Sequence, residues 1–328
     1  MFNHAREIGV KMHLGQEINR VWEGKSSCGI IIDGKKLHAD CIISCDGVHS
    51  ATRSSIINHS PTPRASGYAA YRALIEGKSI AEDPEARWIL EGSESRDKFE
   101  VFFVGDTQLF LQTANKGAEV IWLCFHKDSR PVVDESNTPA NPNDVLNIIK
   151  DWPVAQKLWA VIRHTPSHKF IDYPFFDRDP LPTWRSQKGR MMLAGDAAHY
   201  FSPGGGQGAS QALEDANVIA TCLRIAGRDN VPVALQIAEN IRHPRATAVQ
   251  LLGHRATEAW QKQNIGYAEE GCANIAKFPL HDWVYRYDSQ SHCEAEFDVV
   301  MEAIRTGRAY IPKDVDGMHG EEPKACRL

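Results

Sequence analysis

The sequence has no stretch that approaches the roughly 20 mostly apolar residues of a membrane-spanning helix. Its first residues, MFNHAREIGVK, lack the apolar core of a signal peptide. The 14 histidines form no HExxH motif or other ligand spacing, so no metal site is expected. None of the eight cysteines belongs to a CxxC pair, and four lie in or beside apolar runs, as buried free thiols do. A reducing, cytoplasmic location is the simplest interpretation.

An excess of positive charge is also absent, because the formal net charge is −5. This charge gives no indication of a nucleic-acid partner. Apolar residues make up 42% of the chain and charged residues 24%, which is typical of a soluble globular protein. The 328 residues suffice for one large domain or two closely joined ones.

The strongest pattern in the chain lies in residues 189–227. Residues 191–194 form an unbroken apolar run, which predicts a strand buried on both faces. The run ends at Gly195 and Asp196, where open α/β sheets bind ligands. A glycine-rich loop, residues 204–208, comes next, and apolar residues at helical spacing then predict a helix that stops at Gly227.

This order of elements suits a flat, partly anionic cofactor. Glycines let a ligand approach the backbone, and a helix that begins near Gly208 and Ala209 offers unpaired N–H groups and a positive dipole end. The Asp196 carboxylate can accept hydrogen bonds from a polyol such as ribityl. The alternative is a strand–loop–helix corner whose glycines only make the turn.

The motif GDAAH, a proline four residues later, and then GQG and ED resemble the flavin-contacting motif of class A FAD-dependent aromatic monooxygenases, and most closely the salicylate-hydroxylase-like branch common in fungi. The resemblance implies that Asp196 contacts the ribityl chain. It also implies that Gly208 and Ala209 lie by the pyrimidine edge of the isoalloxazine, with Gly206 in the same cofactor site.

A second motif, DGxxSxxR, begins at Asp46 and Gly47 and resembles another fingerprint of this family. There the aspartate and glycine approach the cofactor diphosphate or the nicotinamide cofactor, and the arginine, here Arg53, braces the loop. The residues alone indicate a turn after a strand, with Ser50 capping a short helix. The alternative is that Asp46 only caps that helix.

Arg72 is the candidate for the substrate side of the active site. Strand alternation places it on the same face as Tyr68 and Ala70, and an arginine there must reach an anion or open water. Its planar fork suits a carboxylate or phenolate. The match to the family's "YR" strand implies a role in the active site, and the alternative is a surface arginine on a sheet edge.

Other polar residues leave more than one interpretation open. His199 is either a proton donor or, as we favour, a residue that orders its own turn. Tyr71 and Tyr200 are candidates for handling the proton of a substrate hydroxyl. For the adjacent carboxylates Glu214 and Asp215 we favour an interaction with the helix dipole over an acid–base pair.

The remaining pattern predicts the rest of the fold. Five strands, which indicate an antiparallel meander, are expected at residues 68–75, 87–90, 99–104, 109–113 and 120–125. Further strands are expected at residues 16–21, 28–32, 39–44 and 170–177, with a hairpin turn at residues 33–34. Helices are expected near residues 141–149, 155–162, 231–258 and 282–304, with a break or kink at Pro244.

No GxGxxG motif occurs near Met1, although the resemblance implies one for the dinucleotide. We therefore expect about a hundred residues of the usual unit to be missing ahead of the first residue. The fold class is α/β, as the remnant of a FAD-binding Rossmann-like domain with an inserted, mostly antiparallel substrate sheet and a C-terminal helical region. The expected domains are residues 1–57 with 177–228, residues 58–176, and residues 229–328.

The resemblance implies a FAD- and NAD(P)H-dependent monooxygenase that hydroxylates a small aromatic or phenolic substrate with O₂, through a flavin C4a-hydroperoxide. Arg72 would hold the substrate, and a role in secondary metabolism is expected. The alternative is a truncated, flavin-less remnant or binding protein. A halogenase is not indicated, because the WxWxIP motif is absent.

Overall fold

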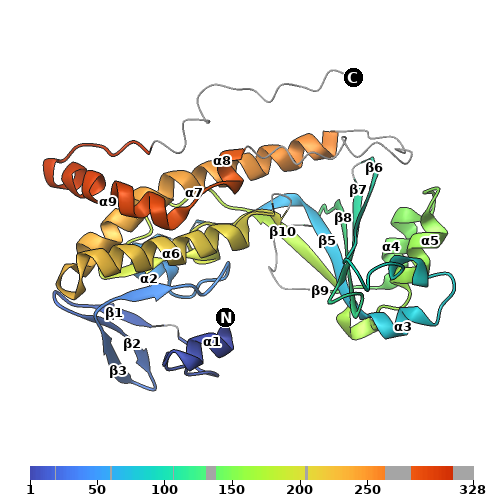
Figure 1. Ribbon diagram of the computed structural model, residues 1–328, viewed down its shortest axis with the longest axis horizontal. Coiled ribbons are helices and arrows are strands. Elements are labelled where there is room, and N and C mark those ends of the chain that lie inside the picture. The colour runs from blue at the N-terminus through green and yellow to red at the C-terminus, as the bar shows by residue number, and fades with distance from the viewer. Residues whose placement is uncertain are drawn as a thin grey trace.

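The computed structural model of the chain describes residues 1–18, 20–59, 61–105, 107–130, 138–203, 206–262 and 282–312. Figure 1 shows two lobes joined by the long strands β5 (Arg64–Glu76) and β10 (Ile171–Asp177). One lobe contains the helices α6 (Gly208–Ala226), α7 (Val231–Lys262) and α9 (Ser289–Thr306), and the other contains a six-stranded sheet. The predicted α/β class, with an antiparallel sheet and C-terminal helices, is confirmed. The domain boundaries stay a prediction.

A pair of parallel strands organises the first lobe. Strand β4 (Ile42–Ser44) lies beside β11 (Met191–Leu193), and the side chains of β11 are at most 3% exposed. They share one apolar core with α6, α7 and α9, which confirms the predicted buried strand. Because carboxyl ends of parallel strands meet at one edge, the loops after β4 and β11 come together there.

A three-stranded antiparallel sheet lies near the N-terminus, with β1 (Val21–Glu23), β2 (Cys28–Ile32) and β3 (Lys35–Ala39). The predicted hairpin turn is confirmed: Asp33 and Gly34 have φ of 48° and 76°, as a type I′ turn requires. Two expected strands differ from the structure. Pairing begins at residue 21 rather than 16, and the expected strand over residues 39–44 is split because β3 pairs with β2 whereas β4 pairs with β11.

The second lobe is built on a six-stranded sheet with three helices. Besides β5 and β10 it contains β6 (Phe99–Val104), β7 (Thr107–Ala114), β8 (Glu119–Lys127), β9 (Thr138–Pro139), α3 (Gly77–Ala81), α4 (Pro142–Ile149) and α5 (Ala155–Ile162). The strand order is β6-β7-β8-β5-β10-β9, with antiparallel neighbours throughout. The three helices share an apolar core with one face of this sheet, where Trp122 is fully buried. The opposite face carries Arg72 on β5 and Tyr173 on β10.

Shorter helices complete the described chain. They are α1 (Phe2–Glu7), α2 (Arg53–Ile57), α8 (Asp282–Tyr285), η1 (Arg87–Ile89), η2 (Ser167–Lys169), η3 (Gly195–Ala197) and η5 (Arg228–Asn230). The strand expected at residues 87–90 is wrong, because this segment is the 3₁₀ helix η1. The carbonyl of Asp83 accepts from the N–H groups of Ala86 and Arg87. This turn leads directly into η1, so Trp88 and Ile89 adopt helical rather than extended backbone angles. Within the described residues, no helix combines the length and apolar character needed to cross a membrane.

The break expected at Pro244 does not occur, because α7 continues through it. A proline inside a helix costs about 3 kcal/mol. Arg242 and Arg245, on either side of Pro244, both form ion pairs with Glu214 on α6. We attribute the uninterrupted helix to these tertiary contacts, which offset the local cost.

Replacing Asn141 with alanine is expected to lower the free energy of unfolding by about 0.5–2 kcal/mol. The Asn141 side chain accepts from the N–H of Asn143, and Asp144 accepts from the N–H of Asn141, which together form a capping box for α4. Urea unfolding measures the loss. Asn141→Ser should retain most of the stability, and equal losses in both variants would contradict the capping role.

Candidate functional site

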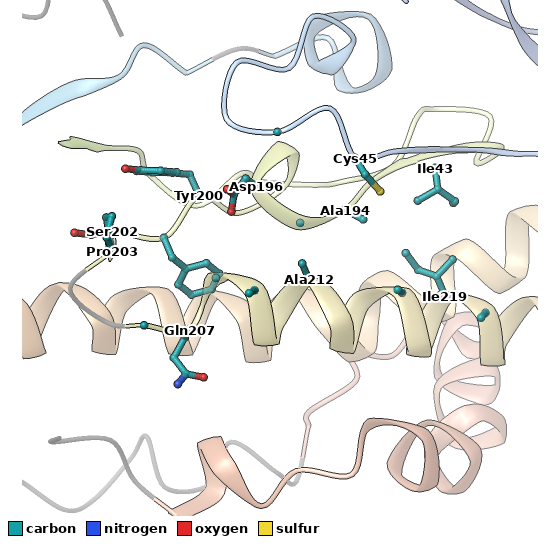
Figure 2. Close-up of a pocket in the computed structure, with 18 of the residues that line it drawn as sticks. Ile43, Cys45, Ala194, Asp196, Tyr200, Ser202, Pro203, Gln207, Ala212 and Ile219 are labelled. Carbon is teal, nitrogen blue, oxygen red and sulfur yellow. The ribbon is translucent and has the colours of Figure 1, made fainter. Parts of the chain in front are cut away.

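A cavity of about 790 Å³ lies between the edge where β4 and β11 end and one face of α6, from Gly208 to Leu223. Ligand pockets in proteins usually enclose about 300–1,000 Å³. Figure 2 shows Ile43, Cys45 and Ala194 on the strand side of the cavity, with Ala212 and Ile219 on the helix side. The two lobes meet here, because Arg72 and Tyr173 of the second lobe also line it.

Asp196 supplies the carboxylate of the cavity. It lies in the turn after β11. Gly195 there has a φ of 58°, in the left-handed region that residues other than glycine rarely adopt. Within the described residues no hydrogen bond engages its carboxylate, and partial burial raises the pKa of this group. Figure 2 shows the side chain pointing toward α6. The oxygens of Asp196 are therefore free to accept hydrogen bonds from a ligand.

The first turn of α6 faces the same space. Gln207 precedes the helix without a side-chain cap, so the first N–H groups of α6 have no partner from a capping side chain. A Cβ atom added at Gly208 would lie 3.7 Å from Oδ1 of Asp196, inside the cavity. Gly206 has a φ of 62° and open space around it, whereas Gly204 and Gly205 lie outside the described residues. The helix start thus offers donors and room for a flat group.

The Asp46 carboxylate is used within its own loop. It accepts from the hydroxyl of Ser44 at 2.7 Å and from the N–H and hydroxyl of Thr52 at 3.1 and 3.0 Å. Burial raises the pKa of this carboxyl group, but these hydrogen bonds outweigh burial and hold the pKa below its ordinary value. Gly47, with a φ of 80°, lines the cavity, whereas Asp46 does not. The geometry thus favours the alternative interpretation, in which Asp46 holds the start of α2.

Arg53 connects the two loops. Its side chain is buried and donates to the carbonyl of Val48 at 3.0 Å and to that of Ala197 at 2.8 Å. Its guanidinium also reaches the carbonyls of Gly47 and Asp196. The bracing role that the resemblance implied for Arg53 therefore extends across both loops and fixes them relative to each other.

Arg72 and Tyr173 form the wall contributed by the second lobe. The guanidinium carbon of Arg72 lies 5.3 Å from the centre of the Tyr173 ring. Within the described residues no hydrogen bond or ion pair engages this guanidinium. A cation held against an aromatic ring can receive an anionic, flat ligand. Sequence reasoning missed Tyr173. The available signal was the alternation of side chains along the strand FIDYPFFD, which places Tyr173 on the face opposite to that of Asp172.

Of the two tyrosines considered for proton handling, only Tyr200 lines the cavity. Burial raises the pKa of its hydroxyl, so it stays protonated at neutral pH. Tyr71 lies on the opposite sheet face, stacked on His126 with ring centres 4.3 Å apart, and burial raises its pKa to about 12. The suggestion that Tyr71 handles a substrate proton is wrong, because strand alternation points it away from Arg72.

His199 and Asp215 lie beneath the cavity rather than in it. Nε2 of His199 is 2.5 Å from Oδ2 of Asp215, and both residues are at most 3% exposed. The favoured interpretation of His199 as a turn-ordering residue agrees with this contact. The helix-dipole role expected for Glu214 and Asp215 is wrong, because neither lies in the first turn of α6 and both form ion pairs with Arg242. No group of three or more metal-ligating side chains is found among the described residues.

These features fit the flavin part of FAD. The first turn of α6 offers N–H groups where a ring can approach, and Asp196 offers free oxygens for a ribityl chain. Glycines at positions 206 and 208 leave the space that a Cβ would fill. Gly47 lines the same cavity beside the strand end.

Comparisons with known proteins agree with this fit. The sequence model of the FAD binding domain family matches residues 1–251. The FAD-dependent monooxygenase nodY2 of Hypoxylon pulicicidum is 38% identical over 314 residues, which cover 96% of this chain and 68% of that protein. Asperlicin C monooxygenase of Petromyces alliaceus is 37% identical over 317 residues, 95% of this chain and 68% of that protein.

Solved structures show the same similarity. The crystal structure of CtdE in complex with FAD and substrate 4 matches with a TM-score of 0.85 and 33% identity, over 93% of this chain and 73% of that one. A salicylate hydroxylase substrate complex, at 23% identity, shares the fold with a TM-score of 0.69 over 88% of this chain and 72% of that one. The chain therefore belongs to the FAD binding domain family, among its FAD-dependent monooxygenases.

Proposed function

We propose that this monooxygenase uses FAD and NAD(P)H to insert one oxygen atom of O₂ into a small aromatic or phenolic substrate in fungal secondary metabolism. The observation that carries the proposal is the placement of Arg72 and Tyr173 in the same cavity as Asp196 and the first turn of α6. One wall offers a cation and a ring to a substrate, and the other offers donors and a carboxylate to a flavin.

Each group at the cavity has a separate task. Bound FAD supplies the transfer of electrons from a nicotinamide to O₂ and of one oxygen atom to the substrate. Asp196 would hold the ribityl chain, and the N–H groups at Gly208 and Ala209 would lie by the pyrimidine edge of the flavin. Gly47 approaches the rest of the cofactor, and Asp46 keeps that loop in place.

On the substrate side, Arg72 binds a carboxylate or phenolate, and an ionised phenol is electron-rich at its ring carbons. Tyr173 stacks beside the guanidinium and orients a flat ring. Tyr200 is buried at the cavity with its hydroxyl protonated, so it serves as a donor to the substrate rather than as a base.

The names of relatives support a small-molecule substrate of secondary metabolism. Asperlicin C monooxygenase and the notoamide E oxidase of Aspergillus versicolor are named for such compounds, and the latter is 34% identical over 95% of this chain. We also propose a cytoplasmic location, which the free thiols of the six described cysteines support.

The absorbance spectrum of the purified chain, before and after addition of excess FAD, tests the flavin site. Flavin bands that stay with the protein through desalting are expected. NADH and NADPH oxidation is then followed with a series of phenolic acids, and ¹⁸O₂ labelling of the product separates oxygen insertion from simple oxidation. A chain that never retains FAD would contradict the proposal and favour the flavin-less alternative, in which this chain only binds other molecules.

A further inference from the structure

A buried polar cluster lies directly beneath the turn that carries Asp196. Its centre is Asp215 on α6, which is fully buried. Oδ2 of Asp215 accepts from the N–H of Gly195 at 2.9 Å and from Nε2 of His199 at 2.5 Å, and Oδ1 accepts from Nε of Arg242 at 2.8 Å. Three donors from two chain segments, the turn over residues 195–199 and α7, therefore converge on one carboxylate.

The carboxylate at the centre of the cluster is ionised. Burial raises the pKa of Asp215, but His199, Arg242 and the N–H of Gly195 outweigh burial and hold the pKa below its ordinary value. Asp215 is thus ionised at neutral pH, and Nε2 of His199 carries the proton of their hydrogen bond. Arg242, also fully buried, donates further to Glu214 and to Oε1 of Gln211. Both oxygens of the Asp215 carboxylate are thus engaged, which fixes the carboxylate in one geometry, whereas Nδ1 of His199 has no hydrogen-bond partner among the described residues.

The cluster reaches the cavity through the backbone. Gly195 immediately precedes Asp196, and its N–H is the group that Asp215 holds. On the other side of the turn, Arg53 donates to the carbonyls of Asp196 and Ala197. The Asp196 carboxylate itself has no partner among the described residues. Its direction is therefore set by the backbone, which Asp215 holds on one side of the turn and Arg53 on the other.

We propose that Asp215, with His199 and Arg242, is the positioning site for flavin binding, because it fixes the Gly195–Asp196 turn against the first turns of α6. Asp215 touches no ligand and acts through Asp196. The inference rests on the proposed flavin site, since it assigns Asp196 to the ribityl chain. Loss of the Asp215 charge therefore weakens FAD binding without removing a contact to FAD.

The chain contains a matched control in its second lobe. Asp172 on β10 is 5% exposed and also lies between a histidine and an arginine, with His126 at 3.1 Å and Arg130 at 2.7 Å. His126 stacks on Tyr71, which lies on the sheet face away from the cavity. Asp172→Asn therefore disturbs a similar buried charge at a distance from the Asp196 turn.

The test is FAD affinity, measured on the full chain by quenching of flavin fluorescence. Asp215→Asn is expected to weaken binding by about 10- to 100-fold, by analogy with the loss of metal affinity when the outer hydrogen-bond partners of metal ligands are removed. Asp172→Asn should leave the affinity within about 2-fold of the parent, whatever it does to thermal stability. Equal losses in the two variants would overturn the inference, because the effect would then come from general destabilisation.

A double-mutant cycle separates positioning from a merely structural role. If Asp215 acts through Asp196, the Asp196→Ala/Asp215→Asn double variant binds FAD within about 2-fold of Asp196→Ala alone. Losses that multiply would overturn the inference. A parent chain that binds FAD, with Asp196→Ala also unimpaired, would instead contradict the proposed role of Asp196 at the flavin site.

A second variant keeps the test valid if Asp215→Asn does not fold. His199→Leu removes one donor and leaves the Asp215–Arg242 pair in place. It should weaken FAD binding, and His199→Gln, whose amide can donate to Asp215, should restore most of the affinity. Parent-like affinity in a folded His199→Leu variant would contradict the part assigned to His199.

Discussion

Replacing Arg242 with methionine is expected to lower the free energy of unfolding by about 3–5 kcal/mol, the cost of breaking a buried ion pair on one side. Methionine approximates the volume of the side chain, so the loss reports charge rather than a cavity. Asp215 would keep its burial but lose the donor at 2.8 Å, and Glu214 would keep Arg245 and the amide of Gln211 as partners. Urea unfolding at pH 7.5 measures the change.

The pH dependence of this loss provides an internal check. In the parent chain the folded-state pKa of Asp215 is lowered, so its contribution is present above the unfolded pKa of about 3.9 and is lost as the pH falls through the folded value. Without Arg242 the burial of Asp215 raises its folded pKa, and the variant gains stability when this carboxylate binds a proton. The difference between the variant and the parent should therefore shrink between pH 7.5 and pH 5.

An exposed pair in the same chain is the control. Arg64 and Asp179 form a close ion pair at 2.6 Å, but their side chains are 59% and 68% exposed. Arg64→Met should cost less than about 1 kcal/mol, because solvent already screens this pair. A loss for Arg242→Met as small as that for Arg64→Met would contradict the account of the buried cluster.

The parts of the fold that the sequence predicts well are those set by local patterns. The apolar run of β11, the small and apolar positions of α6 and the Asp33–Gly34 turn each follow from spacing or from allowed backbone angles. The same patterns placed Asp196 and Gly208 at one cavity, since a strand end and the following helix start are close in sequence.

The buried cluster could not be predicted in this way. Asp215 and Arg242 are 27 positions apart, and charged residues on helices are usually exposed, so spacing alone gives no indication that the two form a buried pair. The continuation of α7 through Pro244 has the same origin, because ion pairs with the distant Glu214 carboxylate offset the local cost of the proline. The turn before η1 is different, because the Asp83 carbonyl bonds residues only three and four positions further on.

Alternation along β5 correctly separates Tyr71 from Arg72, but alternation alone does not say which face is core. That depends on α4 and α5, whose apolar faces cover the side of Tyr71 and leave the side of Arg72 toward the cavity. Tyr173 joins Arg72 through the antiparallel register of β5 with β10, in which residue 173 lies opposite residue 70. Residues about a hundred positions apart thus form one wall.

Replacing Arg72 with alanine is expected to lower kcat/KM for an anionic phenolic substrate by about 30- to 1,000-fold, or about 2–4 kcal/mol. The guanidinium is free to bind a carboxylate or phenolate, and the cavity would be left without the cation that this wall supplies. FAD affinity should stay near that of the parent, because the flavin groups lie on the opposite wall. Steady-state kinetics with the best substrate from the phenolic-acid series measures the loss.

Two comparisons identify what Arg72 does for the substrate. Arg72→Lys keeps the charge but not the planar fork stacked on Tyr173, so it should recover only part of the lost kcat/KM. A neutral analogue of the same ring should lose far less than the anion when Arg72 is replaced, because it has no charge for the guanidinium to bind. If the neutral and anionic substrates lost activity equally, Arg72 would act on the shape of the cavity rather than on charge, and the preference for anionic substrates would have to come from another group.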